Sequence, residues 1–292
     1  LEHSAPQEIM YKKFYWYKSG ITKTMRDGLK ELYFDIKKNC KIKSGDVILD
    51  IGANDGTLLK YFKKDKIITI GCEPANNLKN ELKRNCHYMI NDFWHTKHLK
   101  KIPNKYQKLK VISAIGMFYD LEDPISFVQD IHSVLAKEGV WHFEQSYMPS
   151  MLRMNSYDTI CHEHIEYYSL TPVKMILEKC GLRIIDVKMN AVNGGSFAVT
   201  ACHKNAIFPS NEPLIDWLLE QERSMGINSL TPFVDFKKKV FQHKHDLKDL
   251  LIKLKNAGKV VHGYGASTKG NVLLQFCNIT KNELPFIAEI NE

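Results

Sequence analysis

Polar residues and glycines gather where an apolar stretch of the chain ends, in the segment Val47-Ile-Leu-Asp-Ile-Gly-Ala-Asn-Asp-Gly56. Its candidate binding residues are Asp50, Gly52, Asn54 and Gly56. Glycines allow a tight turn and a close approach of the backbone to a ligand, as at the pyrophosphate sites of dinucleotide-binding folds. Carboxylates at this turn would repel a pyrophosphate, whereas they suit the amino group of a methionine moiety. The segment therefore predicts a site for S-adenosylmethionine, with an NAD-type turn as the alternative.

Three later residues complete a nucleoside site in this interpretation. Glu73 ends the next apolar stretch, 23 positions after Asp50, and a carboxylate there can accept both hydroxyls of a ribose. Asp92 follows a third strand and is placed to hold the adenine amino group, while the ring of Phe93 would stack on the base. Together with the glycine turn, these intervals strengthen the prediction of S-adenosylmethionine.

The densest group of reactive side chains lies within residues 155–169 and contains His162, Glu163, His164 and Glu166. A zinc-protease site needs His at both ends of H-E-x-x-H, and the last position here is Glu166, so we expect no metal bound by this chain. The remaining alternatives are a structural histidine pair and acid/base catalysis. Catalysis is favoured because His titrates near neutrality, and a neighbouring Glu can raise its basicity and fix its tautomer.

The elements that must position these residues alternate between strands and helices. We expect a helix from Ile21 to about Lys41, strands at Val47–Ile51, Ile67–Cys72, Val111–Ala114 and Val140–Glu144, and helices at Pro124–Lys137, ended by Gly139, and Pro172–Cys180. This alternation predicts a parallel sheet covered by helices. The His-rich segment follows the strand that ends at Glu144, at the carboxyl edge where open α/β sheets bind ligands.

Two further strands, Leu182–Met189 and Ser196–His203, are joined by the short turn Asn190–Gly195. They should pair antiparallel, because a parallel pair needs a long crossover connection. A parallel sheet finished by one reversed strand is typical of class I methyltransferases and not of an ordinary dinucleotide-binding fold. The predicted fold class is therefore α/β, a class I methyltransferase Rossmann-like sheet with a reversed last strand.

The last third of the chain predicts a second, smaller unit. Residues 213–257 have a helical pattern, Lys259–Gly265 is a short strand that runs into a glycine turn, and a helix at Thr268–Phe276 and a strand at Phe286–Ile290 follow. This order indicates a truncated Rossmann-like α/β domain. We expect an N-terminal aromatic segment and helix over 1–45, a domain that binds S-adenosylmethionine over 46–204, and a helical and Rossmann-like substrate domain over 205–292.

The composition limits the classes of protein to consider. The 292 residues are 44% hydrophobic and 25% charged, which is typical of a soluble globular chain; no apolar run is long enough to span a bilayer, and no signal peptide opens the sequence. Seven dispersed cysteines without C-x-x-C argue against a disulfide framework or a Cys-rich zinc site and favour a reducing, cytoplasmic compartment. The net charge of +8 fits a lysine-rich solvated surface or a site for a phosphorylated substrate, and no motif predicts nucleic-acid binding.

Five segments carry a more specific signal when they are taken in order. They are Tyr15-Trp-Tyr-Lys-Ser-Gly20, Ile51-Gly-Ala-Asn-Asp-Gly56, Cys161-His-Glu-His-Ile-Glu-Tyr-Tyr-Ser169, Asn193-Gly-Gly-Ser-Phe197 and Gly263-Tyr-Gly-Ala-Ser-Thr-Lys-Gly270. The sequence resembles the sugar C-methyltransferase family, whose members act on nucleotide-linked keto-deoxysugars. The resemblance covers essentially the whole chain. Members usually begin with a small Cys-rich zinc-binding domain, which the resemblance leads us to expect ahead of this sequence.

The resemblance also implies substrate-binding residues. The turn that contains Gly265, Ser267 and Lys269 would hold the sugar nucleotide, and Asn193 would be a further contact. Backbone N–H groups at a helix N-terminus bind phosphate, and the charge of Lys269 adds to that attraction. A plain strand-to-helix turn is the alternative.

The expected reaction is the transfer of a methyl group to a carbon beside a keto group. The resemblance implies that His164, aided by Glu163, removes a proton from that carbon, and that a hydroxyl of Tyr15, Tyr17 or Tyr167 steadies the enolate oxygen. The alternatives are an O-methyltransferase, an NAD-dependent oxidoreductase and a non-enzymatic nucleotide-binding module. No Asn/Asp-Pro-Pro-aromatic turn follows the fourth strand, which argues against a methylase of nucleic-acid bases.

Overall fold

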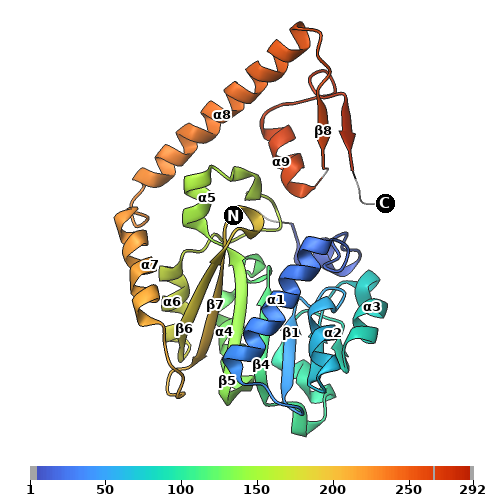
Figure 1. Cartoon of the computed structure of the whole chain (residues 1–292), viewed down its shortest axis with the longest axis vertical. Coiled ribbons are helices and arrows are strands. Elements are labelled where there is room, and N and C mark those ends of the chain that lie inside the picture. Colours follow the sequence, from blue (N-terminus) through green and yellow to red (C-terminus); the bar gives the residue numbers. More distant parts are fainter. Residues whose placement is uncertain (1–4, 266, 290–292) are drawn as a thin grey trace.

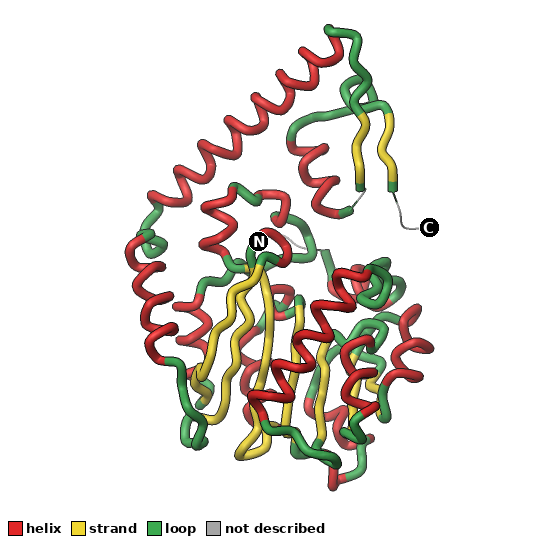
Figure 2. The backbone as a smooth tube through the Cα atoms, in the orientation of Figure 1, coloured by secondary structure: helices red, strands yellow, loops and turns green. Residues whose placement is uncertain are grey.

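The computed structural model describes residues 5–265 and 267–289. Within these residues the chain forms a seven-stranded sheet covered by helices and a separate two-stranded sheet with its own helix (Figure 1). Figure 2 shows the larger sheet in yellow, with the red helices on either side of it. The two sheets are connected by a helical segment that leaves the edge of the larger one.

The larger sheet begins with five parallel strands. They are β1 Val47–Ile51, β2 Ile68–Cys72, β3 Tyr88–Ile90, β4 Leu109–Ile115 and β5 Leu135–Ser146. Adjacent strands of this set are parallel, and all five residues of β1 are buried. A strand buried on both faces needs a continuous apolar run, which explains why the sequence pattern located β1 correctly.

The sheet ends with β6 Leu182–Asn190 and β7 Ser196–His203, in the spatial order β3-β2-β1-β4-β5-β7-β6. β7 is antiparallel both to β5 and to β6. This arrangement confirms the predicted reversed last strand. Because β7 runs backwards, its first residue lies at the same edge as the carboxyl ends of the parallel strands.

Helices cover both faces of the sheet and bury apolar residues at intervals of three or four. One face carries α1 Lys23–Cys40, α2 Thr57–Lys64 and α3 Lys79–Asn85, and the other carries α4 Pro124–Val134, α6 Leu170–Lys179 and α7 Glu212–Ser224. α1 begins at the N-cap Thr22, whose side chain accepts a hydrogen bond from the Met25 N–H. It buries Leu29, Leu32 and Ile36 against the sheet, the spacing that a half-buried helix requires.

The predicted helix at Pro124–Lys137 was wrong at its C-terminal end. α4 stops at Val134, and the next residue already belongs to β5. Leu135 is buried and pairs with Leu109 of β4, so sheet pairing overrides the helical pattern there. The predicted strand at Val140–Glu144 is correspondingly too short at both ends.

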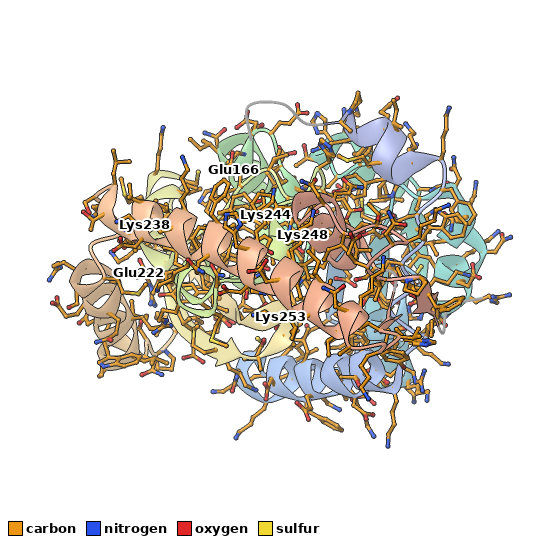
Figure 3. All side chains as sticks on the ribbon, turned by 90° about the horizontal axis from the view of Figure 1, so that it is seen from above. Glu166, Glu222, Lys238, Lys244, Lys248 and Lys253 are labelled. Carbon is orange, nitrogen blue, oxygen red and sulfur yellow. The ribbon has the colours of Figure 1, made fainter. Side chains whose placement is uncertain are left out.

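The remaining elements lie beyond the reversed strand. α8 Thr231–Asn256 is a long helix that reaches from α7 to the small sheet, in which β8 His262–Tyr264 and β9 Phe286–Ala288 are parallel and α9 Thr268–Phe276 lies between them in sequence. Figure 3 shows Lys238, Lys244, Lys248 and Lys253 along α8. The Lys244 ammonium lies 4.7 Å from the ring centre of Phe276 in α9, which holds these two helices together. The predicted strand at Phe286–Ile290 extends into residues outside the described part of the chain.

No helix in the described ranges combines the length and the apolar character needed to cross a membrane.

A buried carboxylate fastens α7 to the sheet. Glu222 is 1% exposed, and its oxygens accept hydrogen bonds from the Leu170 N–H at 2.5 Å, the Thr171 N–H at 2.9 Å and the Tyr147 hydroxyl at 2.7 Å. Two of these donors are the first N–H groups of α6, so the carboxylate satisfies a helix N-terminus that would otherwise lack acceptors. Figure 3 labels Glu222, which lies on α7.

We predict that Glu222→Ala lowers stability by about 3 kcal/mol, because several buried donors lose their acceptor. Differential scanning calorimetry should show this as a melting temperature that is about 8 °C lower. The matched control is Glu220→Ala, since Glu220 lies on the same helix and is exposed, with an ion pair only to Arg223. Equal melting temperatures for the two variants would contradict the assigned role of Glu222.

Candidate functional site

The glycine turn after β1 is fastened to the end of β2. The N–H groups of Gly52 and Ala53 both donate to the Cys72 carbonyl, at 2.9 and 3.0 Å. The Glu73 carboxylate accepts from the Asn54 N–H and from the Ala75 N–H, each at 2.9 Å. Burial raises the pKa of Glu73, and these two backbone donors partly oppose that effect. The turn and the acid predicted to bind ribose are therefore one unit.

Glycine is required at both ends of this turn. Gly52 and Gly56 have φ angles of 71° and 78°, which lie in the left-handed region that side chains rarely adopt. A Cβ on Gly56 would lie 2.8 Å from the Cβ of Asn85, and a Cβ on Gly52 would lie 3.2 Å from Met117. The bare backbone of this turn thus packs directly against α3 and against the residue Met117 that follows β4.

Asp50 provides a buried carboxyl group at the base of the turn. Its side chain is 4% exposed and accepts a hydrogen bond of 2.7 Å from the Ser113 hydroxyl on the neighbouring strand β4. Burial raises its pKa to about 7, with a further rise from the nearby Glu73. Among the described residues no salt bridge compensates Asp50. Contact between Asp50 and the amino group of S-adenosylmethionine stays a prediction.

The residues predicted to contact adenine lie after β3. The Asp92 carboxylate accepts from the Phe93 N–H at 3.0 Å and forms an ion pair of 3.4 Å with Lys12. The Lys12 ammonium lies 5.8 Å from the ring centre of Phe93. The N-terminal segment therefore reaches this position as well, although no sequence pattern indicated a Lys12 contact.

The N-terminal aromatic segment is held across the glycine turn. The Asn54 side chain accepts from the Ser19 N–H at 2.9 Å and donates to the Tyr17 carbonyl at 3.0 Å. Asn77 makes two hydrogen bonds of 2.9 Å with the Tyr15 backbone. The Asn54 and Asn77 side chains thus hold the backbone of this segment. Because Asn54 belongs to the glycine turn, the segment lies against that turn.

The two N-terminal tyrosines differ in their surroundings. Tyr17 is 46% exposed, whereas Tyr15 is partly buried, and burial raises its pKa, followed by the charges of Glu163, Asp120 and Glu73. Tyr15 is thus within electrostatic range of both the predicted ribose acid and the His-rich segment. Of the two predicted tyrosines, it is the one that lies between the two halves of the site.

His164 lies on the loop after the 3₁₀ turn Tyr157–Thr159. Its Nδ1 is 3.0 Å from the Thr159 carbonyl, and its ring centre is 4.3 Å from that of Tyr119. A carbonyl can only accept, so Nδ1 carries the proton and Nε2 keeps a free lone pair. We predicted from the sequence that Glu163 fixes this tautomer. In the structure the Thr159 carbonyl fixes it instead. Burial lowers the pKa of His164 to about 4, helped by the charge of Lys269.

A small cavity opens beside this imidazole. Its walls are formed by Tyr119, Ser146, Met148, Met151, His164, Glu166 and Tyr167. The Ser146 hydroxyl is buried and has no hydrogen-bond partner within the described residues, while the Tyr167 hydroxyl donates to the Thr159 carbonyl at 3.4 Å. The cavity therefore joins the predicted base, one predicted tyrosine and an unsatisfied hydroxyl.

Sequence reasoning missed the residues that follow β4. The Tyr119 carbonyl accepts from the N–H groups of Ile165 and Glu166, at 3.2 and 3.0 Å, so this short 3₁₀ turn holds the His164 loop in place. Burial raises the pKa of Asp120 well above its usual range, and this side chain lies near Tyr11. Their position at the carboxyl end of a central strand is the signal that could have identified them as candidates.

The predicted substrate-binding residues near the C-terminus differ in their surroundings. Gly265 is exposed with a φ of 91°, and the Ser267 hydroxyl caps α9 by accepting from the Gly270 N–H at 3.3 Å. Lys269 is partly buried, and burial lowers its pKa, while the nearby charges of Asp158 and Cys161 oppose that shift. Lys269 thus faces the His164 loop. The side chain of Asn193 lies outside the described part of the structure.

The small C-terminal unit is docked on the loop that carries His164. The Tyr157 hydroxyl is 2.9 Å from Nδ1 of His243 in α8 and 3.3 Å from the Cys277 sulfur after α9. Tyr157, Val240 and Cys277 form one buried cluster. Through this cluster, the beginning of the His164 loop and the C-terminal helices share a single small core.

The strand order, the acidic glycine turn and the acid after β2 define an S-adenosylmethionine-dependent methyltransferase of class I. A family model described as a methyltransferase domain matches residues 17–187, more than half of the sequence, and the chain belongs to this methyltransferase family. A second model, described as a C-methyltransferase C-terminal domain, matches residues 191–292.

A curated relative extends this comparison. The chain is 28% identical to the C-methyltransferase NovU of Streptomyces niveus over 248 residues, which is 85% of this chain and 59% of NovU. The chain therefore spans little more than half the length of that relative.

Solved structures give weaker matches. Magnesium protoporphyrin IX methyltransferase of Synechocystis PCC 6803 with bound SAH is 9% identical, with 64% of this chain and 90% of that chain covered and a TM-score of 0.49. A SAM-dependent methyltransferase of Aquifex aeolicus is 19% identical, with 60% and 97% covered and a TM-score of 0.42. The fold class follows from the strand order and not from these matches.

We predict that the affinity for S-adenosylhomocysteine is about tenfold lower at pH 6 than at pH 8. Asp50 has a raised pKa of about 7 in the free protein, and the amino group of the ligand favours its charged form, so binding below that pH must first remove a proton. Isothermal titration calorimetry across this range measures the effect.

The Asp50→Asn variant should bind more weakly and lose this pH dependence. Asp46→Asn is the matched control, because Asp46 precedes the same strand at the opposite edge of the sheet. An Asp50→Asn variant with the pH profile of the wild type would show that another group titrates.

Proposed function

We propose that this protein is an S-adenosylmethionine-dependent C-methyltransferase that methylates the carbon beside the keto group of a nucleotide-linked deoxysugar, with His164 as the general base. The observation that carries this proposal is the environment of His164, a neutral imidazole that lines a small cavity together with Tyr119 and Tyr167. The name of the relative NovU and the C-methyltransferase model over residues 191–292 support transfer to carbon.

Burial suits His164 to proton abstraction at neutral pH. With a pKa lowered to about 4, its imidazole is neutral throughout the physiological range, so every molecule of enzyme has a lone pair available. The same burial makes it a weak base in the free protein, and the imidazolium formed on proton transfer needs a counter-charge. A carboxylate oxygen of Glu163 lies within 4.8 Å of a His164 ring nitrogen. This distance supports Glu163 as the counter-charge.

The reaction then follows from the placement of the side chains. The keto group acidifies the adjacent C–H, Nε2 of His164 accepts that proton, and the bonding electron pair moves to the enolate oxygen. When bound, the sulfonium cofactor supplies the electrophilic methyl group, which the substrate carbon takes as S-adenosylhomocysteine is released. The protein holds the reacting atoms in line, and the proton on His164 is later returned to water.

Tyrosine hydroxyls are suited to steady the enolate oxygen. Burial raises the pKa of Tyr15 and of Tyr167, so both phenols keep their protons and can donate a hydrogen bond to a developing oxyanion. The Tyr15 hydroxyl lies within electrostatic range of Glu163, and Tyr167 lines the cavity beside His164. The exposure of Tyr17 makes it the weakest of the three predicted donors.

Lys269 is the proposed contact for the nucleotide-linked end of the substrate. It lies in the first turn of α9, where backbone N–H groups and a positive side chain together favour phosphate. Its electrostatic contact with the His164 loop links the phosphate position to the reacting end. Gly265 and Ser267 would contribute backbone and the helix cap to the same contact.

The test is the exchange of the substrate hydrogen beside the keto group, followed by NMR in D₂O with S-adenosylhomocysteine present. His164→Asn should lower both exchange and methyl transfer by about 10³-fold, since it removes the base, while its affinity for S-adenosylhomocysteine stays that of the wild type. His162→Asn, an exposed neighbour on the same loop, should behave as the wild type.

Turnover like the wild type in His164→Asn would exclude this residue as the base. Methyl transfer without any hydrogen exchange would instead identify an O-methyltransferase, because methylation of a hydroxyl does not break a C–H bond.

A further inference from the structure

Three different metal-binding side chains converge on the His164 loop. The Cys161 thiol, the Glu163 carboxylate and the His164 imidazole each offer a donor atom, and all three atoms lie within 4.8 Å of one another. The His164 N–H donates to the Cys161 carbonyl at 3.2 Å, so a single tight turn brings these side chains together. Sulfur, nitrogen and carboxylate oxygen are the donors that zinc uses in proteins.

The imidazole is oriented as a metal-binding histidine would be. Histidine ligands almost always donate their second ring N–H to a carbonyl or carboxylate, which fixes the tautomer and aims the other nitrogen at the metal. Here the Thr159 carbonyl receives Nδ1–H at 3.0 Å. The lone pair of Nε2 therefore stays available to a cation.

Cys161 differs from the other cysteines of the chain. All seven lie in the described residues; six are buried, and Cys161 alone is only partly buried. The side chains of Glu163, Asp120 and Lys269 lie within electrostatic range of its sulfur. Cys161 is thus the most accessible of the described cysteines.

We propose that Cys161, Glu163 and His164 form a binding site for Zn²⁺ or a similar divalent cation, with the fourth position open. Bonds of about 2.0–2.3 Å place the donors of a tetrahedral ion roughly 3.5 Å apart, so the side chains need to close by about 1 Å. We expected no metal because the second histidine of H-E-x-x-H is missing, whereas the structure brings together the side chains of C-x-E-H. If His164 is the proposed base, the bound cation occupies its lone pair and inhibits the enzyme; that consequence rests on the proposed function.

The test uses Co²⁺ as a spectroscopic probe for the full chain kept in its reduced form. Cobalt bound to a thiolate gives a sulfur-to-metal charge-transfer band in the near ultraviolet, which ZnCl₂ should abolish by displacement. Cys161→Ser should remove the band, and Glu163→Gln and His164→Asn should weaken cobalt binding by about tenfold or more. Cys180→Ser is the control, because its thiol is buried and makes only a long contact to the Ile125 carbonyl.

Each variant is accepted only if it binds S-adenosylhomocysteine as the wild type does, and Cys161→Ala replaces Cys161→Ser if the first fails this check. A wild-type chain without the band, or a band that persists in both Cys161 variants, overturns the proposal. Zinc inhibition that disappears in the Cys161 variant supports it. A cobalt band without zinc inhibition supports the metal site and argues against His164 as the base, so the two proposals fail separately.

Discussion

The buried carboxylate of Glu73 is the interaction on which the rest of the site depends. It holds the Asn54 N–H and so fixes the glycine turn against β2. Asn54 in turn holds the backbone of the N-terminal segment through Tyr17 and Ser19, and that segment carries Tyr15 toward Glu163. A single acid, placed by the end of one strand, thus determines the positions of groups that are far apart in the sequence. Its burial is costly for a charged group, and the two backbone donors offset that cost.

The sequence was sufficient for those parts of the fold that rest on burial and chain connectivity. The apolar run of β1 and the short connection before Ser196 each have one structural solution, a buried parallel strand and a reversed neighbour. The end of α4 at Val134 could not be predicted, because it depends on Leu135 pairing with Leu109 of a distant strand. The position of the glycine turn could be predicted from neighbouring residues in the sequence, whereas the end of α4 depends on tertiary contacts.

The candidate site shows the same division. His164 and Glu163 stand out by residue type, yet the tautomer of the imidazole depends on the Thr159 carbonyl, which no side-chain pattern reveals. Tyr119 holds the loop by its backbone carbonyl, a role that any residue type could fill, so its identity carried no signal. Cys161 was set aside as one of several dispersed cysteines. Only folding the turn shows that its sulfur, and not a second histidine, lies beside the other two donors.

The docking of Tyr157 on α8 and α9 has a consequence for protein engineering. Its hydroxyl contacts His243 and Cys277, so part of the His164 loop belongs to the same small core as the C-terminal helices. Recombining this C-terminal unit with the methyltransferase sheet of a homologue would leave the loop against a surface with which it never packed. Chimeras designed to change acceptor preference should therefore place their crossover so that residues 155–169 travel with the C-terminal unit, even though the sheet separates the two in sequence.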